Sequence, residues 1–230
     1  MEFMPEGPMA IPLWVNGHAF LTASQEFFDV VNPATGQAQR RVPLCGEDEA
    51  LEVVAAARAA QPGWAASAQD ERQACLGRLA DALDRYTGHF AKLLVQDTGR
   101  DEAEATAEVA AAVAALRAIG QGNAGVWGVV LDASRPLAGF AGQIAAAAHA
   151  GATLVVKPSP KAPSAIFALC ELSGRAEWPA GVLNLLQGDL AALRGLAAGG
   201  IDRLVYVGGP ELAGPVAEVA AAAGVPCEQA

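Results

Sequence analysis

The stretch LVVKPSP at residues 154–160 is a short apolar run that ends at a lysine and two prolines. Proline has no backbone N–H group, so a central strand does not continue through it. The stretch is therefore predicted to contain a buried strand over 153–156, with Lys157 just beyond its carboxyl end. A solvated strand end and a contact between Lys157 and a ligand are both open interpretations.

Three other apolar runs resemble this strand, and helical segments separate all four. Strands that alternate with helices of this length form right-handed βαβ units around a parallel sheet. The predicted fold class is α/β, a doubly wound parallel Rossmann-like sheet whose ligands bind beyond the carboxyl ends of the strands. The other strands are predicted at 125–131, 182–186 and 204–207, and the helices at 136–150, 164–175, 190–198 and 211–223.

The chain before this sheet is predicted to begin with a short hairpin. Residues 13–15 (LWV) precede Asn16-Gly17, which is a strong turn signal. The run FFDVV at 27–31 can supply the second strand of the hairpin. The cluster NPATG at 32–36 that follows is predicted to be a turn.

A helical segment is predicted to follow this hairpin. A helix over 47–60 carries Leu51 and Val54 at helical spacing, and Ser67 with Asp70 forms a start similar to a capping box. We expect two parts within one compact unit. Residues 1–124 form the hairpin and helical segment, 125–230 form the nucleotide-binding domain, and the remaining helices run from Ser67 to Phe90 and over 101–119.

The composition excludes several function classes. The formal net charge of −10 over 230 residues repels phosphate backbones, so nucleic acid is not expected as a partner. The three histidines and four cysteines show no ligand spacing and no CxxC pair, so no metal site is predicted. No signal peptide and no membrane span are recognised, and the expected location is the cytoplasm. The four cysteines are Cys45, Cys75, Cys170 and Cys227.

A glycine turn forms the second candidate site. The run LVYVGGPELAG at 204–214 is a strand, a paired-glycine turn and a helix start, with Pro210 in the first helical turn. Paired glycines let a backbone approach a ligand, and the free N–H groups of a helix start favour a phosphate. A purely structural turn is the alternative, because Glu211 in the first turn would oppose a phosphate.

The lysine motif and the glycine turn, in this order and spacing, resemble the aldehyde dehydrogenase superfamily. The resemblance extends over nearly the whole chain. It includes DTGR at 97–100, similar to "ETGK", and GATLVVKPS at 151–159, similar to "GNTVVLKPS". The further similar segments are WVNG at 14–17, VNPATG at 31–36, GVWGVV at 125–130 ("VGVVG"), 179–189 ("PPGVLNVVTGD") and 208–214 ("GSTEVG").

This resemblance implies a site for NAD or NADP. In the family, the lysine after the second strand lies against the adenosine ribose, and Lys157 is expected to inherit that role. The glycines of the turn are expected beside the pyrophosphate. The cofactor-binding residues implied by the resemblance are Lys157, Ser159, Gly188, Gly208 and Gly209.

Several positions depart from the pattern of the family. Pro160 replaces the glutamate of "KPSE" that accepts hydrogen bonds from the ribose, and Gly209 replaces the serine of "GS". Ser134, in DASRP at 132–136, aligns with the oxyanion asparagine of "PWNFP". Glu228 falls near the general-base glutamate, and Cys227 is interpreted as a strand cysteine rather than a nucleophile. No catalytic residue is therefore assigned.

Two larger differences predict a naturally reduced member of the family. The catalytic domain would follow Glu228, and the oligomerisation hairpin is replaced by QGNA at 121–124. The predicted function is that of a non-catalytic protein with a degraded NAD(P) site and a scaffold or interaction role. Its partner would be a second copy or a full-length relative. The alternative is the cofactor-binding half of a dehydrogenase completed by a separate catalytic chain, and NAD, NADP or no cofactor all stay open.

Overall fold

The computed structural model describes residues 8–22 and 26–230. Its larger sheet has the strand order β10-β9-β6-β7-β8-β2-β3. The first five strands run parallel to one another, β2 pairs antiparallel with β8, and β3 pairs antiparallel with β2. The strands are β2 (Leu13–Val15), β3 (His18–Phe20), β6 (Val126–Leu131), β7 (Thr153–Lys157), β8 (Leu183–Leu185), β9 (Arg203–Val207) and β10 (Cys227–Gln229).

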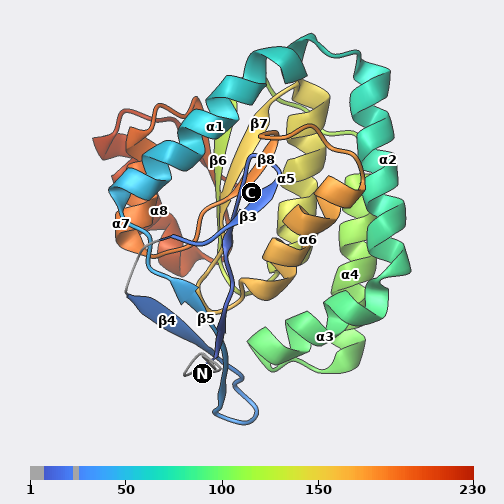
Figure 1. Ribbon diagram of the computed structural model, residues 1–230, viewed down its shortest axis with the longest axis vertical. Helices are drawn as coiled ribbons and strands as arrows, with labels where there is room; N and C mark the ends of the chain where they lie inside the picture. The colour runs from blue at the N-terminus through green and yellow to red at the C-terminus, as the bar shows by residue number, and fades with distance from the viewer. Residues whose placement is uncertain (1–7, 23–25) are drawn as a thin grey trace, which may run out of the picture.

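Helices cover both faces of this sheet, as Figure 1 shows. One face is covered by α1, α7 and α8, and the other by α5 and α6, with α2, α3 and α4 packed outside that second pair. This arrangement confirms the predicted doubly wound α/β fold. The helices are α1 (Glu47–Ala66), α2 (Gln69–Arg85), α3 (Thr87–Thr98), α4 (Glu102–Leu116), α5 (Pro136–Ala150), α6 (Ser164–Arg175), α7 (Leu190–Ala198) and α8 (Pro210–Ala222).

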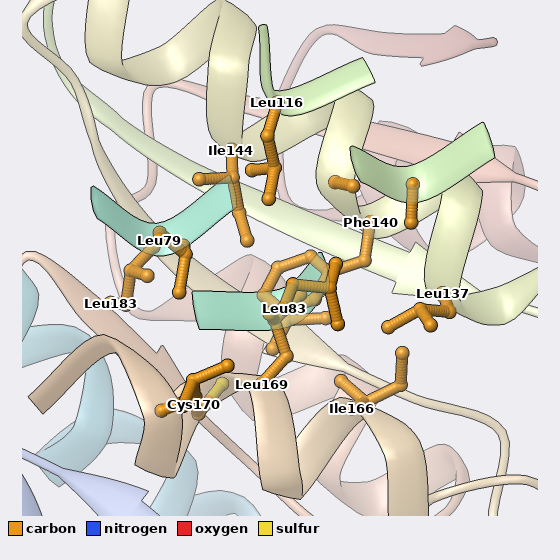
Figure 2. Close-up of a cluster of buried hydrophobic side chains, with 14 of the residues drawn as sticks. Leu79, Leu83, Leu116, Leu137, Phe140, Ile144, Ile166, Leu169, Cys170 and Leu183 are labelled. Atoms are coloured by element: carbon orange, nitrogen blue, oxygen red, sulfur yellow. The ribbon is translucent and has the colours of Figure 1, made fainter. Parts of the chain in front are cut away.

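The hydrophobic core forms two layers, one on each face of the sheet. The layer under α5 and α6 is the larger, and it extends outward to α2, α3 and α4. Figure 2 shows part of it, where side chains from α2, α4, α5 and α6 converge around Phe140. The layer on the opposite face lies between the sheet and α1, α7 and α8. The two layers hold the strands rigidly, so the strand ends have defined positions.

The predicted hairpin is wrong in its second strand. Asn16 and Gly17 have φ values of 52° and 81°, which suits a two-residue turn that pairs the residues immediately beside it. Val15 therefore pairs with His18, and β4 (Phe27–Val31) pairs instead with β5 (Ala38–Pro43). The strand β1 (Met9–Ala10) completes this small second sheet.

The hairpin β2–β3 also belongs to the larger sheet, because Trp14 pairs with Leu185 of β8. The first part of the chain thus supplies strands to the same sheet as the second part. The division of the chain at 124/125 stays a prediction.

Three helix predictions in the first half also need correction. Leu51 is 42% exposed, because the inward face of α1 consists of Ala50, Val53, Val54 and Ala57. Ser67 ends α1, and the reciprocal cap of α2 is formed by the Glu71 side chain and the Ala68 N–H group. The expected single helix to Phe90 divides at Tyr86, before Thr87 and Gly88, which have low helix propensity.

Candidate functional site

The carboxyl ends of the parallel strands form one edge of the sheet. In the register of the strands, Val130 of β6 lies opposite Lys157 of β7 and Tyr206 of β9. The loop 132–135 and the turn Gly208-Gly209 therefore meet at this edge. This brings the predicted residues Lys157, Ser134, Gly208 and Gly209 to one side of the molecule, where α/β folds bind ligands.

Three helices that begin at this edge are capped by carboxylates from elsewhere in the chain. Asp97 at the end of α3 accepts hydrogen bonds from the Ser164 backbone N–H (2.8 Å) and hydroxyl (2.9 Å) at the start of α6. Glu108 of α4 accepts one from the Leu137 N–H at the start of α5 (2.9 Å). Asp132 accepts one from the Gly209 N–H at the start of α8 (2.7 Å). The positive ends of these helices are thus neutralised internally.

The Glu108 cap is part of a buried ion pair that positions the loop after β6. Glu108 is 5% exposed and forms an ion pair with Arg100. The other side of the Arg100 guanidinium donates to the Ser134 carbonyl (2.8 Å). A charge-assisted contact of this kind holds the loop 132–135 against α4.

Within that loop the Ser134 side chain is already hydrogen-bonded. Its hydroxyl donates to Asp132 Oδ1 over 2.5 Å, and its backbone N–H donates to the same oxygen over 2.8 Å. Partial burial raises the pKa of Asp132, but the hydrogen bonds from Ser134 and Gly209 outweigh it and lower that pKa below its usual value. Asp132 is therefore a carboxylate at neutral pH, and Ser134 faces it rather than an open oxyanion position.

The space above the two glycines is filled by carboxylates. A Cβ atom on Gly208 would lie 2.6 Å from Asp132 Oδ2, and one on Gly209 would lie 2.5 Å from Glu211 Oε2. The Tyr206 hydroxyl donates to the Gly209 carbonyl (2.9 Å). Burial raises the pKa of Tyr206, and the Asp132 and Glu211 charges raise it further. The turn presents negative charge where a phosphate would bind, so its residues do not fit a pyrophosphate as they are arranged.

Lys157 is the last residue of β7 rather than a residue beyond the strand, and it is 6% exposed. Burial lowers the pKa of Lys157 to about 8, and the Asp189 charge partly opposes this. Ser159 is half-buried, and its hydroxyl accepts a hydrogen bond from the Lys161 N–H (3.3 Å). Asp189, at the start of α7, is thus the negative charge in the chain that favours the charged form of Lys157.

Gly188 lies between β8 and α7, with φ of 122°. A Cβ atom there would lie 2.8 Å from the Ala192 Cβ and 3.0 Å from the Cys45 backbone. Close packing is therefore sufficient to explain this glycine.

Glu228 and Cys227 lie on the edge strand β10. In the register of the strands Glu228 lies opposite Val205, and its side chain forms an ion pair with Arg203, the first residue of β9. The Glu228 carboxylate is therefore engaged within the sheet. Burial raises the pKa of Cys227, and the Glu228 charge raises it further.

The residues that close the edge were not predicted as site residues. Asp97 was noted only within DTGR, and Asp132 only within the loop that contains Ser134. Asp132 stands at the first proline of "PWNFP", and this replacement of a proline by a carboxylate is the signal that could have indicated its role. Nothing in the sequence pairs Glu108 with Arg100 or with α5.

A hollow of about 910 Å³ adjoins the edge, between the small sheet, α3, α4 and the loop 132–135. Its lining includes the apolar residues Phe28, Val31 and Ala107 and the basic residues Arg135 and Lys161. Across residues 8–22 and 26–230, no group of three or more histidine, cysteine or acidic side chains could hold a metal ion. No helix in those ranges is long and apolar enough to cross a membrane.

The parallel sheet, the helices on both of its faces and the glycine turn after β9 define a domain of the Rossmann-like α/β class. The model of the aldehyde dehydrogenase family matches residues 20–124 and 122–228. The chain belongs to the aldehyde dehydrogenase family.

Several curated proteins are similar in sequence. N-succinylglutamate 5-semialdehyde dehydrogenase from a Caulobacter strain is 34% identical, over 77% of this chain and 41% of that protein. Glutarate-semialdehyde dehydrogenase from Pseudomonas putida is 27% identical, over 86% of this chain and 47% of that protein. The chain thus spans less than half the length of these relatives.

Solved structures show the same fold. Lactaldehyde dehydrogenase from Escherichia coli matches with a TM-score of 0.89 at 23% identity, over 97% of this chain and 52% of that chain. An aldehyde dehydrogenase from Pseudomonas syringae, determined with NAD⁺ and octanal, matches with a TM-score of 0.87 at 25% identity, over 95% of this chain and 49% of that chain.

Proposed function

We propose that this chain is a non-catalytic member of the family, with a vestigial NAD(P) site and a role in binding another protein. It does not oxidise aldehydes by itself.

The raised pKa values of the four cysteine thiols are the main support for the proposal. Aldehyde oxidation in this family needs a thiolate that attacks the aldehyde, and a thiol with a raised pKa supplies little thiolate at neutral pH. Burial raises the pKa of the Cys45 thiol to about 12 and strongly raises the pKa of the Cys170 thiol. Burial also raises the pKa values of Cys75 and Cys227. All four thiols of the chain therefore lack the environment of a nucleophile.

The other catalytic groups that the resemblance implies are engaged elsewhere. The Ser134 hydroxyl donates to Asp132, and Glu228 is ion-paired with Arg203. An oxyanion donor and a general base need free groups aimed at the reacting atoms. These contacts support the loss of catalysis by this chain alone.

Exposed apolar side chains support the interaction role. Near the first strands, Met9 is 78% exposed and Leu21 is 66% exposed, with Phe20, Phe27 and Val31 also exposed. A contiguous apolar surface commonly marks a contact with another protein, and the proposal takes these side chains to form one. The proposed partner is a second copy of the chain or a full-length relative.

An activity assay with a matched mass measurement tests the proposal. The purified chain is incubated with NAD⁺ or NADP⁺ and a panel of aliphatic and semialdehyde substrates, and the absorbance of the reduced cofactor is followed. We expect no turnover above the rate without protein. Light scattering, alone and with a full-length relative, is expected to show a complex. Turnover at enzyme-like rates, or a monomer under every condition, would contradict the proposal.

A second candidate function is the cofactor-binding half of a split dehydrogenase. The hollow beside the carboxyl edge favours it, because a catalytic chain could cover Ser134 and Arg135 there. In that case a separate catalytic polypeptide of the family would restore aldehyde oxidation when mixed with this chain. No turnover from that mixture would exclude this function.

A further inference from the structure

The carboxylate of Asp132 lies at the place in the fold where a pyrophosphate would bind. It accepts the Gly209 N–H group at the start of α8 over 2.7 Å, which is the geometry that an anionic ligand adopts at a helix start. Its second oxygen accepts both donors of Ser134, so the side chain is held on two sides. The carboxylate is thus a fixed part of the turn.

Two further groups reinforce this arrangement. Glu211 brings a second negative charge beside Gly209, within 2.5 Å of where a Cβ atom would lie. The Gln229 side-chain amide donates to the Gly208 carbonyl (3.0 Å), so the other glycine of the turn is also tied to the chain itself. A phosphate would have to displace Asp132 from its three donors and would meet the charge of Glu211.

We propose that Asp132 acts as an internal anion that closes the nucleotide site. The dinucleotide is excluded by a carboxylate bound in place of its pyrophosphate, while the Rossmann fold around the site is intact. This inference rests on the proposed function, because it takes the NAD(P) site to be vestigial, and it names the residue responsible.

The inference predicts that nucleotide binding can be regained by changing one side chain. Asp132→Asn removes the charge with little change in shape, and Asp132→Ala removes the occupant and frees the Gly209 N–H group. Each variant is titrated with NAD⁺, NADP⁺ and ADP-ribose in a calorimeter. Removing one unfavourable charge close to a phosphate is expected to strengthen binding about ten- to a hundredfold.

The matched control is Glu218→Gln, which makes the same change in net charge on the exposed side of α8, away from its start. It is expected to bind no better than the wild type. Glu211→Gln combined with Asp132→Asn is expected to bind most tightly. Far-UV circular dichroism and a melting curve establish that each variant is folded before it is titrated.

The outcomes separate this inference from the proposed function. Saturable wild-type binding at micromolar nucleotide would overturn the inference, and so would folded Asp132 variants that bind no better than the wild type. An equal gain in Glu218→Gln would also overturn it, because net charge alone would then explain the effect. The aldehyde assay on the same samples reports independently on the proposed function.

Discussion

The two apolar layers and the carboxyl edge of the sheet follow different physical rules. The layers consist of buried aliphatic and aromatic side chains, which interdigitate on both faces of the strands. The edge holds three charged residues that are each less than a tenth exposed, namely Asp97, Glu108 and Lys157. Burial of a charge opposes folding unless the group is paired or hydrogen-bonded. The layers thus stabilise the folded state, whereas burial of the charges at the edge opposes folding.

This difference supports the proposal that the carboxyl edge is a vestigial ligand site. Buried charges and capped helix starts at one edge are typical of a binding site rather than of a core. In this chain Asp97, Glu108 and Asp132 cap three helix starts at the edge, and Glu108 is also ion-paired with Arg100.

The largest effect is expected in the layer of Figure 2. Phe140 is fully buried on α5 between side chains of α2, α4 and α6. Phe140→Ala is expected to lower the free energy of unfolding by about 4 kcal/mol, because it removes buried contacts and leaves a cavity. Leu190→Ala, at a position that is 46% exposed, is the control and is expected to cost well under this amount. Chemical denaturation measures the free energy of unfolding of both variants. A similar loss in the two would contradict the conclusion that the apolar layers supply the stability.

A stabilising change is expected at Lys157, in contrast to the layers. Its pKa of about 8 in the folded state lies below the usual 10.5 because of burial, so the charged form is disfavoured on folding. Stability is therefore lowest below pH about 8 and rises as the pH climbs toward the unfolded value. Lys157→Met is expected to raise the free energy of unfolding at neutral pH by about 2 kcal/mol. A loss of stability at neutral pH would show that the Lys157 charge is well compensated.

A pH-dependent effect of similar size is expected at Asp97. Burial raises the pKa of Asp97 from 3.8 to about 6, although the Ser164 hydrogen bonds and the Arg40 charge act in the opposite direction. The folded state then binds a proton more tightly than the unfolded state does, so Asp97 contributes stability that grows as the pH falls through about 6. The gain between neutral pH and pH about 4 is expected to be about 2 kcal/mol.

Asp97→Asn removes this titrating group and keeps an oxygen for the Ser164 N–H group. Stability measured over the same pH range is expected to change less in this variant than in the wild type. Identical profiles for the two proteins would show that Asp97 titrates with its ordinary pKa in the folded state.

The second half of the fold could be predicted well from the sequence, and the first half less so. The limits of α6 and α7 agree with the prediction, since proline or glycine marks the ends of those segments. The hairpin was misassigned because Asn16-Gly17 fixes a turn but leaves open which run pairs next. On α1 the prediction was right for Val54 and wrong for Leu51, because the many alanines of this helix give a weak pattern.

For the candidate site, the sequence alone determined that the strands alternate with helices and that Lys157 and the paired glycines terminate two of the strands. Local periodicity and turn chemistry suffice for these features, because they depend on neighbouring residues. Only the tertiary structure decided which groups lie together. Asp132 and Gly209 are separated by 77 positions in the sequence, so no local pattern relates them. They meet because β6 and β9 are neighbours in the sheet. The charge that now occupies the glycine turn is therefore a property of the fold.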